Sequence, residues 1–306
     1  MRCHIVGFDG FDLDVLFNMS FFYSECGYSI SFSREPRDAD VLVIQRGKLR
    51  NQYPAIKVRE VHAYEYVGEP IGDVTHAFPA AESVITIFPS LQNRYRAGGR
   101  VVEAFPPVMP ELWRRKDDAQ RSRADRAIHI SHFKKMAERD NYATRLLAAV
   151  RDGRIEVWGA GWTEPCANSV ARLHGPASLH DCQALYASAH IAIGLMYPFQ
   201  RASTFSGRMW QAPLNGCALI SEPAALAVNM PGVIAQEAYV DDIDVRGVGT
   251  PSDIVDAAIS YWSSQTDALR EALQLTAAKR RPRQNRFLAS AMLRAHDIRS
   301  RFRAVR

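Results

Sequence analysis

Short apolar runs alternate with stretches of helical spacing along the first 116 residues. The runs are flanked by Gly, Pro or Asp, which is typical of buried strands that enter a loop. Residues 13–26 have the apolar spacing of a helix that stops at Gly27. The expected strands lie at residues 3–8, 28–33, 41–45, 56–62 and 83–88. Strands that alternate with helices and turns predict a layer of parallel strands covered by helices.

The same pattern restarts after the charged segment Arg114–Arg126, in which residues 117–126 are the expected linker. Further strands are expected at residues 127–131, 155–159, 170–175, 190–195, 217–221, 232–235 and 237–240. Helices are expected at residues 142–150, 179–187, 207–215, 254–262, 268–278 and 287–302. The pattern therefore predicts two α/β domains, residues 1–116 and 127–278, with a ligand site in a cleft between them. A basic helical segment, residues 279–306, is expected to pack back on the first domain.

Length and composition fit this picture. The 306 residues suffice for two cores, and 47% hydrophobic with 23% charged residues exclude a disordered or fibrous chain. No apolar run reaches the length of about 18 residues that a spanning helix needs. Asp9 and Asp12 interrupt any apolar core of a signal peptide. The five cysteines are odd in number and lack a CxxC pair, so we expect neither a disulfide framework nor a zinc site. This use of cysteine is typical of a protein in the reducing cytoplasm.

Positive charge is concentrated at the C-terminus. Lys279–Arg306 holds ten Lys and Arg and one acid, Asp297, so this segment carries +9 and the rest of the chain −4, within a net charge of +5. Such a segment is suited to phosphate, anionic lipid or nucleic acid. The alternative is a solvated helix face rich in Arg. We therefore expect a cytoplasmic protein with peripheral contact at the inner face of a membrane.

Two glycine turns follow expected strands. Gly7 and Gly10 come directly after the first strand, where a backbone can approach a ligand closely, although a plain turn explains them equally and the pattern is not GxGxxG. Gly159 and Gly161 follow the strand at residues 155–159 and precede Trp162. Glycines so spaced let backbone N–H groups face an anion or a ribose. The alternative is a strand-to-loop turn with an aromatic lid.

Hydroxyl groups and arginine gather before the helix expected at residues 207–215. Ser203, Thr204 and Ser206 precede it, and Arg208 lies in its first turn, which together form a natural phosphate seat. The alternative is ordinary N-capping by Ser206. Lys134 or Lys135 can neutralise a diphosphate. Their neighbours His129 and His132 would lie on opposite faces of a strand, so no metal pair is expected.

A general base can be sought in the first domain. His62 lies at the end of an expected strand with Glu60 and Glu65 nearby, and such a His can take a proton. A His that is only hydrogen-bonded is the simpler interpretation. The chain has no HExxH motif and no P-loop, and Asp241-Asp242 is read as a turn.

Four pieces of the second half together resemble the C-terminal domain of the GT-B glycosyltransferases, in particular the branch of CgeB-like and family 1-type proteins. In order, they read IHISHFKK, IEVWGAGW, ARLHGPASLHDCQALYASAHIAIGL and SGRMWQAPLNGCALISEP. The resemblance implies two Rossmann-like α/β domains facing each other across a cleft. It implies transfer of a sugar from a nucleotide-diphosphate donor to a glycan, lipid-linked or protein acceptor, as in polysaccharide biosynthesis. It also implies no cofactor and no bound metal.

Residues can be assigned from the same resemblance. The diphosphate would lie on Ser203, Thr204, Ser206 and Arg208 with Lys134 or Lys135, and the nucleoside would border Gly159, Gly161 and Trp162. An inverting enzyme would take its base from His62, Asp9 or Asp12. The chain departs from the pattern at Gln211, where relatives carry a Glu that binds ribose.

Two alternatives therefore stay open. Gln211 suggests a catalytically degenerate protein that binds a nucleotide-sugar or a glycan. The Arg-rich segment suggests a nucleic-acid binder, against which stand the negative body and the lack of a reader module.

Overall fold

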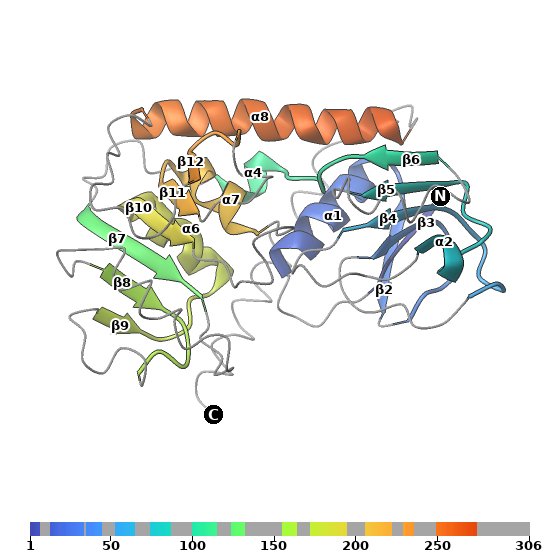
Figure 1. Ribbon diagram of the computed structural model, residues 1–306, viewed down its shortest axis with the longest axis horizontal. Helices are drawn as coiled ribbons and strands as arrows, with labels where there is room; N and C mark the ends of the chain where they lie inside the picture. The colour runs from blue at the N-terminus through green and yellow to red at the C-terminus, as the bar shows by residue number, and fades with distance from the viewer. Residues whose placement is uncertain are drawn as a thin grey trace. The chain divides into compact units, whose positions relative to one another are not determined.

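The computed structural model describes residues 1–6, 13–33, 35–44, 53–64, 74–86, 100–114, 124–131, 155–163, 172–194, 206–221, 229–235 and 249–273. The chain divides into two compact units, whose sheets are coloured blue to green and green to orange in Figure 1. Unit 1 consists of Met1–Met109, Ser203–Ser206 and Trp262–Ser290. Unit 2 consists of Pro110–Ala202, Gly207–Tyr261 and Ala291–Arg306. The division falls at Met109, before the region expected to link the domains.

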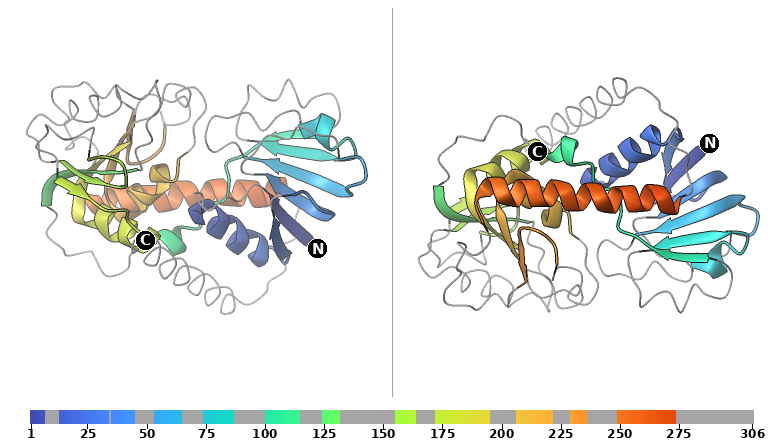
Figure 2. Two further views of the ribbon diagram at one scale, coloured as in Figure 1. Left: turned by 90° about the horizontal axis from the view of Figure 1, so that it is seen from below. Right: turned by 90° about the horizontal axis from the view of Figure 1, so that it is seen from above.

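Unit 1 is built on a parallel sheet of six strands in the order β2-β1-β3-β4-β5-β6, which fan out side by side in Figure 2. The strands are β1 (Arg2–Val6), β2 (Ser29–Ser33), β3 (Ala39–Ile44), β4 (Val58–Ala63), β5 (Ser83–Thr86) and β6 (Arg100–Glu103). Helix α1 (Leu13–Glu25) follows β1, and the short helix α2 (Val74–Ala77) precedes β5. Residues of β1 and β3 are buried almost throughout, as the continuous apolar runs predict. Strand β6 was not expected, since only two apolar residues, Val101 and Val102, mark it.

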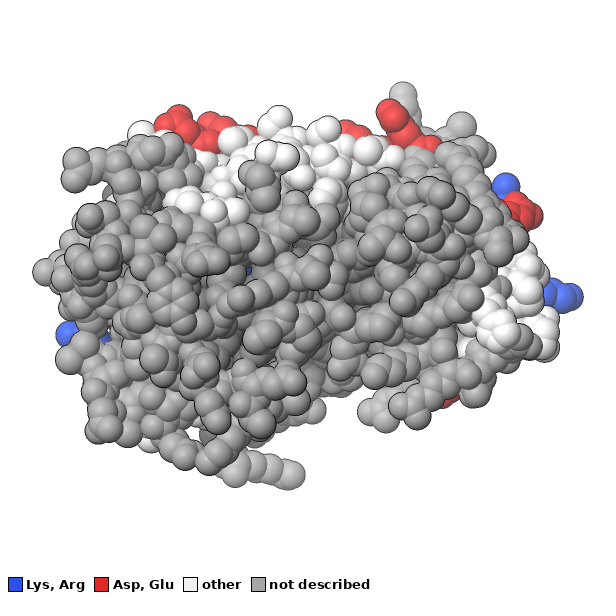
Figure 3. Space-filling model, in the orientation of Figure 1, with Lys and Arg blue, Asp and Glu red and all other residues white. Residues whose placement is uncertain are grey.

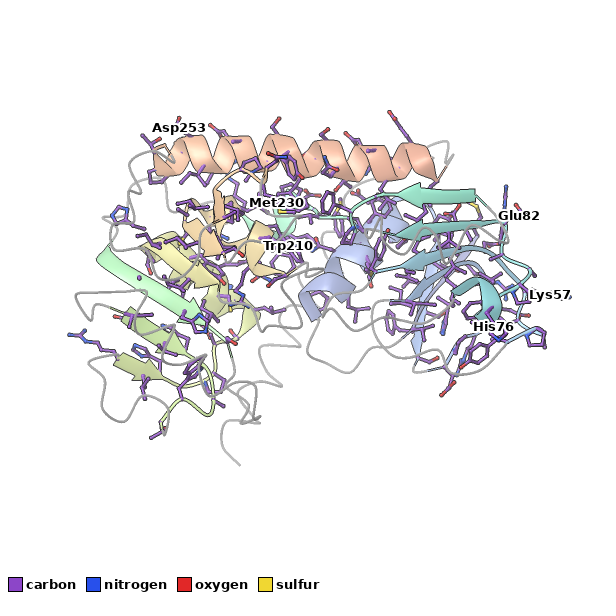
Figure 4. All side chains as sticks on the ribbon, viewed as in Figure 1. Lys57, His76, Glu82, Trp210, Met230 and Asp253 are labelled. Atoms are coloured by element: carbon purple, nitrogen blue, oxygen red, sulfur yellow. The ribbon has the colours of Figure 1, made fainter. Side chains whose placement is uncertain are left out.

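Unit 2 also holds a parallel sheet of six strands, in the order β12-β11-β10-β7-β8-β9. The strands are β7 (Ala124–Ile130), β8 (Ile155–Trp158), β9 (Arg172–His174), β10 (Ala189–Gly194), β11 (Ala218–Ser221) and β12 (Val233–Ala235). The helices are α4 (Pro110–Trp113), α6 (Leu179–Ser188), α7 (Arg208–Gln211), the 3-10 helix η4 (Pro213–Asn215) and the first part of α8 (Pro251–Ala272). Buried residues such as Trp210 and Met230 lie inside this unit (Figure 4). Two parallel α/β layers are thus confirmed, and β7 begins at Ala124, within the range expected for the linker.

The prediction of a single helix at residues 207–215 is wrong. Helix α7 ends at Gln211, and Pro213 starts the separate 3-10 helix η4, which Gly216 closes with φ of +70°. Proline lacks the N–H of an α-helix and its ring collides with the carbonyl four residues earlier, which explains the break. Ser206 is not the N-cap either: Gly207 holds that position and makes no side-chain capping bond. A helix of one turn has little macrodipole, so any anion seat here depends on side-chain charge.

The helix expected at residues 254–262 and the first residues of the one expected at 268–278 form one helix, α8, which ends at Ala272; residues 274–278 lie outside the described residues. Its polar stretch Ser263–Asp267 suggested a break, but Thr266 is 4% exposed and hydrogen-bonds Val108. The Thr266 hydroxyl accepts from the Val108 N–H at 3.1 Å and donates to the Val108 carbonyl at 2.8 Å. Thr266 therefore has a backbone partner inside unit 1, whereas Ser264 and Asp267 face solvent. The polar stretch can for this reason be part of a continuous helix.

The exposed face of α8 is acidic. Asp253, Asp256, Asp267 and Glu271 are exposed, and acidic atoms gather along α8 in Figure 3. Asp253 caps the helix start, where its carboxylate accepts from the Thr250 N–H at 2.9 Å, and it lies at the outer end of the helix in Figure 4. In the described part of the chain, no helix is both long and apolar enough to cross a membrane. Residues 279–306, expected to form a basic helix, lie outside the described residues.

Candidate functional site

The strand order of unit 2 points to one edge of its sheet. The order reverses between β7 and β10, which pair in parallel although two strands separate them in the chain. In open parallel α/β sheets, ligands bind outside the carboxyl ends of the strands at such a switch point. The carboxyl ends of β7 and β10 lie at Ile130 and Gly194. The residues that gather at this edge therefore form the candidate site.

His129 is the buried polar group at the switch point. It lies on β7, is 0% exposed, and its Nδ1 is 2.8 Å from the carbonyl oxygen of Ile193 on β10. A carbonyl only accepts, so Nδ1 carries the hydrogen and the ring joins the two strands. Burial and the positive charge of Arg208 lower the pKa of His129 to about 3, although the bond to Ile193 acts in the opposite direction. The ring is therefore neutral at physiological pH.

Arg208 brings a fixed positive charge to the same place. It is the first residue of α7 and is half-buried, with its Nη1 shielded from solvent. Its positive charge contributes to the lowered pKa of His129, so the two side chains interact electrostatically. A partly desolvated guanidinium interacts strongly with phosphate and can bind it with two parallel hydrogen bonds.

The glycine turn after β8 borders this edge. Gly159 and Gly161 have φ of +146° and +85°, a region in which side chains are disfavoured, so the turn needs glycine. Trp162 closes the turn and is 2% exposed. Its Nε1 donates to the carbonyl of Ser131 at 2.7 Å, and its ring meets the ring of His129 edge-on at 5.2 Å. Ser131, directly after β7, is thus tied to the turn after β8, and Ala160 and Gly161 are the exposed residues of that turn.

Sequence reasoning missed an aromatic pair at the same sheet edge. The rings of Trp158 and His174 stack in parallel, with centroids 4.1 Å apart and 6° between their planes. His174 Nε2 lies 3.3 Å from a carboxylate oxygen of Glu156. These residues end β8 and β9, which are neighbours in register. Their positions at two strand ends were the available signal, but only the pairing of strands reveals the contact.

His62, the expected base, lies in the interior of unit 1. It is 0% exposed on β4, and its Nε2 is 2.6 Å from a carboxylate oxygen of Glu60. Its Nδ1 accepts from the hydroxyl of Tyr23, and the Tyr64 hydroxyl lies 3.4 Å away. Burial raises the pKa of both Tyr hydroxyl groups. The hydrogen-bonded alternative is thus realised, while a role of His62 as base stays a prediction.

Of the remaining expected site residues, the structure describes Gln211 and Ser206. Gln211 is 7% exposed, and its backbone carbonyl accepts from Nδ2 of Asn215 at 2.8 Å. Ser206 is half-buried and precedes Gly207. The other expected residues lie outside the described residues: Asp9, Asp12, Lys134, Lys135, Ser203 and Thr204. Within the described residues, no group of three or more His, Cys, Asp and Glu side chains is arranged to hold a metal ion.

Solved structures resemble the chain in fold. A glycosyltransferase involved in avilamycin A biosynthesis matches with a TM-score of 0.64 at 15% identity, over 92% of this chain and 99% of that one. The T4 phage enzyme in complex with its UDP-glucose substrate matches with 0.57 at 12% identity, over 89% and 99%. HepE of Anabaena in complex with UDP and glucose matches with 0.57 at 11% identity, over 90% and 99%. No curated protein sequence matches the chain.

The sequence also matches a protein-family model. Residues 139–304 match the model described as glycosyl transferase-like. The matched range includes the glycine turn after β8, the strand β10 and Arg208. It extends over more than half of the 306 residues. The chain therefore belongs to the glycosyl transferase-like family and is a glycosyltransferase with the GT-B fold.

Proposed function

We propose that the protein transfers a hexose from a UDP-sugar, and that the diphosphate of the donor binds in unit 2 beside Arg208. The observation that carries the proposal is the half-buried guanidinium of Arg208, whose charge lowers the pKa of His129 at the switch point of the sheet. The uridine is supported by the neighbours, because the phage enzyme and HepE were solved with UDP-glucose or with UDP and glucose.

The donor would extend along the sheet edge from Arg208 toward the glycine turn. Gly159 and Gly161 leave room for a ligand near the backbone, and Ala160 and Gly161 are exposed. In this proposal Lys134 or Lys135, Ser203, Thr204 and Ser206 complete the phosphate contacts, and Gln211 binds the ribose. The ring of Trp162 is buried, so in this proposal it supports the turn that borders the nucleoside and does not itself lie open to the ligand.

Transfer without a metal is part of the proposal. The leaving diphosphate gains negative charge as the sugar departs, and a fixed guanidinium can stabilise that charge. Arg208 supplies such a group in a partly desolvated position. A structure of the phage enzyme contains UDP and Mn²⁺. Activity should therefore be measured with EDTA and with added Mn²⁺; a rate that survives EDTA supports the proposal.

The acceptor is a glycan, a lipid-linked glycan or a protein. Deprotonation of its hydroxyl would fall to Asp9, Asp12 or His62. We favour the two aspartates, which follow β1 in the chain, because the ring of His62 is fully buried and both its nitrogens have partners. Asp9→Asn or Asp12→Asn should then lower kcat by about a hundredfold or more, the usual contribution of a general base. The variant His62→Gln should act on stability more than on kcat.

The first experiment measures thermal stabilisation by the diphosphates of uridine, guanosine, adenosine, cytidine and thymidine, with and without Mg²⁺. A ligand at a hundred times its dissociation constant adds about 2.7 kcal/mol of stability. UDP should stand out, and Arg208→Ala should reduce its effect strongly. A matched control is Arg172→Ala, which removes an exposed arginine from the edge strand β9. No response to any diphosphate would contradict the donor site.

Gln211 favours a second candidate, a relative that binds the donor without transferring it. A Gln can hydrogen-bond ribose but brings no charge to the site. Release of UDP from UDP-glucose, measured with candidate acceptors present, separates the two functions. The acceptors tested should include DNA, since one of the matching structures is of a β-glucosyltransferase described as a DNA modifying enzyme. UDP binding without any turnover, together with turnover gained by Gln211→Glu, would support the second candidate.

A further inference from the structure

We propose that His174 is a positioning residue, whose stacked ring holds Trp158 and thereby fixes the glycine turn that borders the nucleoside of the donor. The inference rests on the proposed function, because it concerns the nucleoside side of the same donor site. It divides the affinity for UDP into two parts: the rings at the ends of β8 and β9 serve the nucleoside, whereas Arg208 serves the diphosphate.

The two rings lie at the carboxyl ends of neighbouring strands. Trp158 is the last residue of β8 and His174 the last residue of β9, and the two are partners in the parallel register of these strands (Figure 1). Strands in a sheet are about 4.8 Å apart, so the side chains of such partners leave the sheet side by side on one face. The next residues, Gly159 and Gly175, begin the loops at the edge where open α/β sheets bind ligands. The rings therefore stand at the base of both loops.

Stacking fixes the angle of the indole. The rings of His174 and Trp158 are parallel within 6°, with centroids 4.1 Å apart. Nε1 of Trp158 is shielded from solvent, and among the described residues it has no hydrogen-bond partner. The orientation of the indole hence depends on its contact with the imidazole and not on a hydrogen bond. Loss of the imidazole would leave a half-buried indole free to change its rotamer beside the turn.

The imidazole is itself held in place. Its Nε2 lies 3.3 Å from a carboxylate oxygen of Glu156, which is buried on β8 two residues before Trp158 and therefore on the same face of the sheet. The backbone carbonyl of His174 accepts from the N–H of Gly159 at 3.4 Å. His174 thus contacts the strand before the turn through its ring and the first residue of the turn through its backbone.

A fixed turn matters because glycine has more backbone freedom to lose than any other residue. Gly159 and Gly161 have φ of +146° and +85°, and Ala160 and Gly161 are exposed. A turn that is held before the nucleoside arrives loses less entropy on binding. A ring pair that served only packing would affect the stability of unit 2 and would treat every ligand alike. A positioning pair affects the nucleoside and spares the diphosphate.

The experiment uses calorimetric titration of the full chain with UDP and with inorganic pyrophosphate, which lacks the nucleoside. His174→Ala should weaken UDP binding about tenfold, the upper range for one aromatic pair, and should change pyrophosphate binding by less than about twofold. His174→Phe keeps a ring that can stack and should bring UDP affinity to within about threefold of the wild type. His174→Gln keeps a polar group near Glu156 without a ring and should resemble His174→Ala. The control His190→Ala removes an exposed histidine of β10 and should leave both affinities unchanged.

Equal weakening of UDP and pyrophosphate by His174→Ala would overturn the inference and leave a packing role. Should His174→Ala fail to fold, the other two variants decide, because UDP binding by His174→Gln as strong as by His174→Phe would overturn it as well. Hydrogen exchange is a second readout: a peptide over residues 159–162 should exchange faster in His174→Ala, and unchanged exchange would mean that the ring does not hold the turn. No UDP binding by the wild-type chain would instead contradict the proposed function, whereas equal UDP binding by wild type and His174→Ala would overturn this inference alone.

Discussion

Buried polar side chains are the most informative single residues of this protein. His4, His62 and His129 are each at most 1% exposed, and each is hydrogen-bonded. Burial lowers the pKa of His4 and His129, so these rings are kept neutral. The three lie on strands of the two sheets and join neighbouring chain segments. Protonation of His4 or His129 is consequently expected to affect stability first.

Unit 2 should lose stability as the pH falls below neutrality. His129 has a pKa of about 3 in the folded protein, below the value of 6.5 expected of an exposed ring. The unfolded chain therefore binds the proton first, so stability is fully present above about pH 6.5 and is lost as the pH falls toward 3. The loss is about 1.4 kcal/mol for each pH unit within this window. Hydrogen exchange of peptides from β7 and β10 at pH 7 and pH 5 measures it.

The variant His129→Asn provides the comparison for this prediction. It should be less stable at pH 7 but should lose less between pH 7 and pH 5, because the group that binds the proton is gone. An identical pH dependence in the wild type and the variant would mean that other groups control the acid sensitivity. His190→Asn, at an exposed position, should behave like the wild type.

At the scale of elements, side chains fix the backbone at the point where the chain leaves unit 1 and enters unit 2. Thr266 bonds both the N–H and the carbonyl of Val108, and Asn18 accepts from the Met109 N–H at 2.9 Å. In unit 2, Gln183 donates to Leu112 and Asn215 to Trp113, both at 2.9 Å. The chain between Val108 and Trp113 is therefore fixed near its two ends, each within its own unit.

Thr266→Val should destabilise unit 1 by about 2–3 kcal/mol. The substitution keeps the shape of the side chain but leaves the buried N–H and carbonyl of Val108 without the hydroxyl, and each unsatisfied group costs about 1–3 kcal/mol. Urea unfolding followed by hydrogen exchange in unit 1 measures the change. Ser264→Ala, on the exposed face of the same helix, should stay within about 0.5 kcal/mol of the wild type.

Gly232→Ala tests the packing of α8 on the turn before β12. Gly232 has φ of +72°, and an added Cβ would lie 2.7 Å from Ile254 and 2.9 Å from Pro213. Strain at such a backbone position costs about 1–3 kcal/mol, and the collisions add to it. We expect a clear fall in the melting temperature of unit 2. Gly175→Ala is the matched control, because nothing lies within 4 Å of its added Cβ. Equal melting temperatures for the two variants would refute this view of the turn.

At the scale of the whole molecule, charge is separated along the chain. Residues 279–306 carry +9, whereas the remainder carries −4 and includes the acidic exposed face of α8. A polybasic segment contributes about 1 kcal/mol per Lys or Arg at an anionic lipid surface. We therefore expect contact with an anionic membrane surface from this segment and not from α8.

The full chain should bind vesicles that contain anionic lipid and should ignore neutral vesicles. Replacing Arg280, Arg281, Arg283 and Arg286 by Gln should weaken this binding by about 4 kcal/mol, and added salt should weaken it in the wild type. Cosedimentation with vesicles measures both effects. Binding that persists unchanged in the fourfold variant would locate the contact elsewhere. UDP binding by the variant serves as the control for an intact donor site.

Much of the fold could be predicted from the sequence because its signals are local. Apolar runs marked β1, β3, β8 and β10, and the helical spacing marked α1 and α6, with ends that shift by only a few residues. The family match confirms the glycosyltransferase prediction that rested on four ordered sequence pieces. Strand β6 was not predicted because two apolar residues are a weak signal. The length of α8 escaped because a polar stretch reads as a loop until its backbone partner is known.

By itself, the sequence determined the alternation of strands and helices, the uneven charge and the glycines at strand ends. It also placed Arg208 near the candidate phosphate site. Only the tertiary structure decided which strands are neighbours, and therefore that His129 meets Ile193 and that the charge of Arg208 contributes to its lowered pKa. It also buried Trp162 and His62, which the sequence presented as open to a ligand. The reason is physical: local patterns depend on residues a few positions apart, whereas burial and pKa depend on groups brought together from distant parts of the chain.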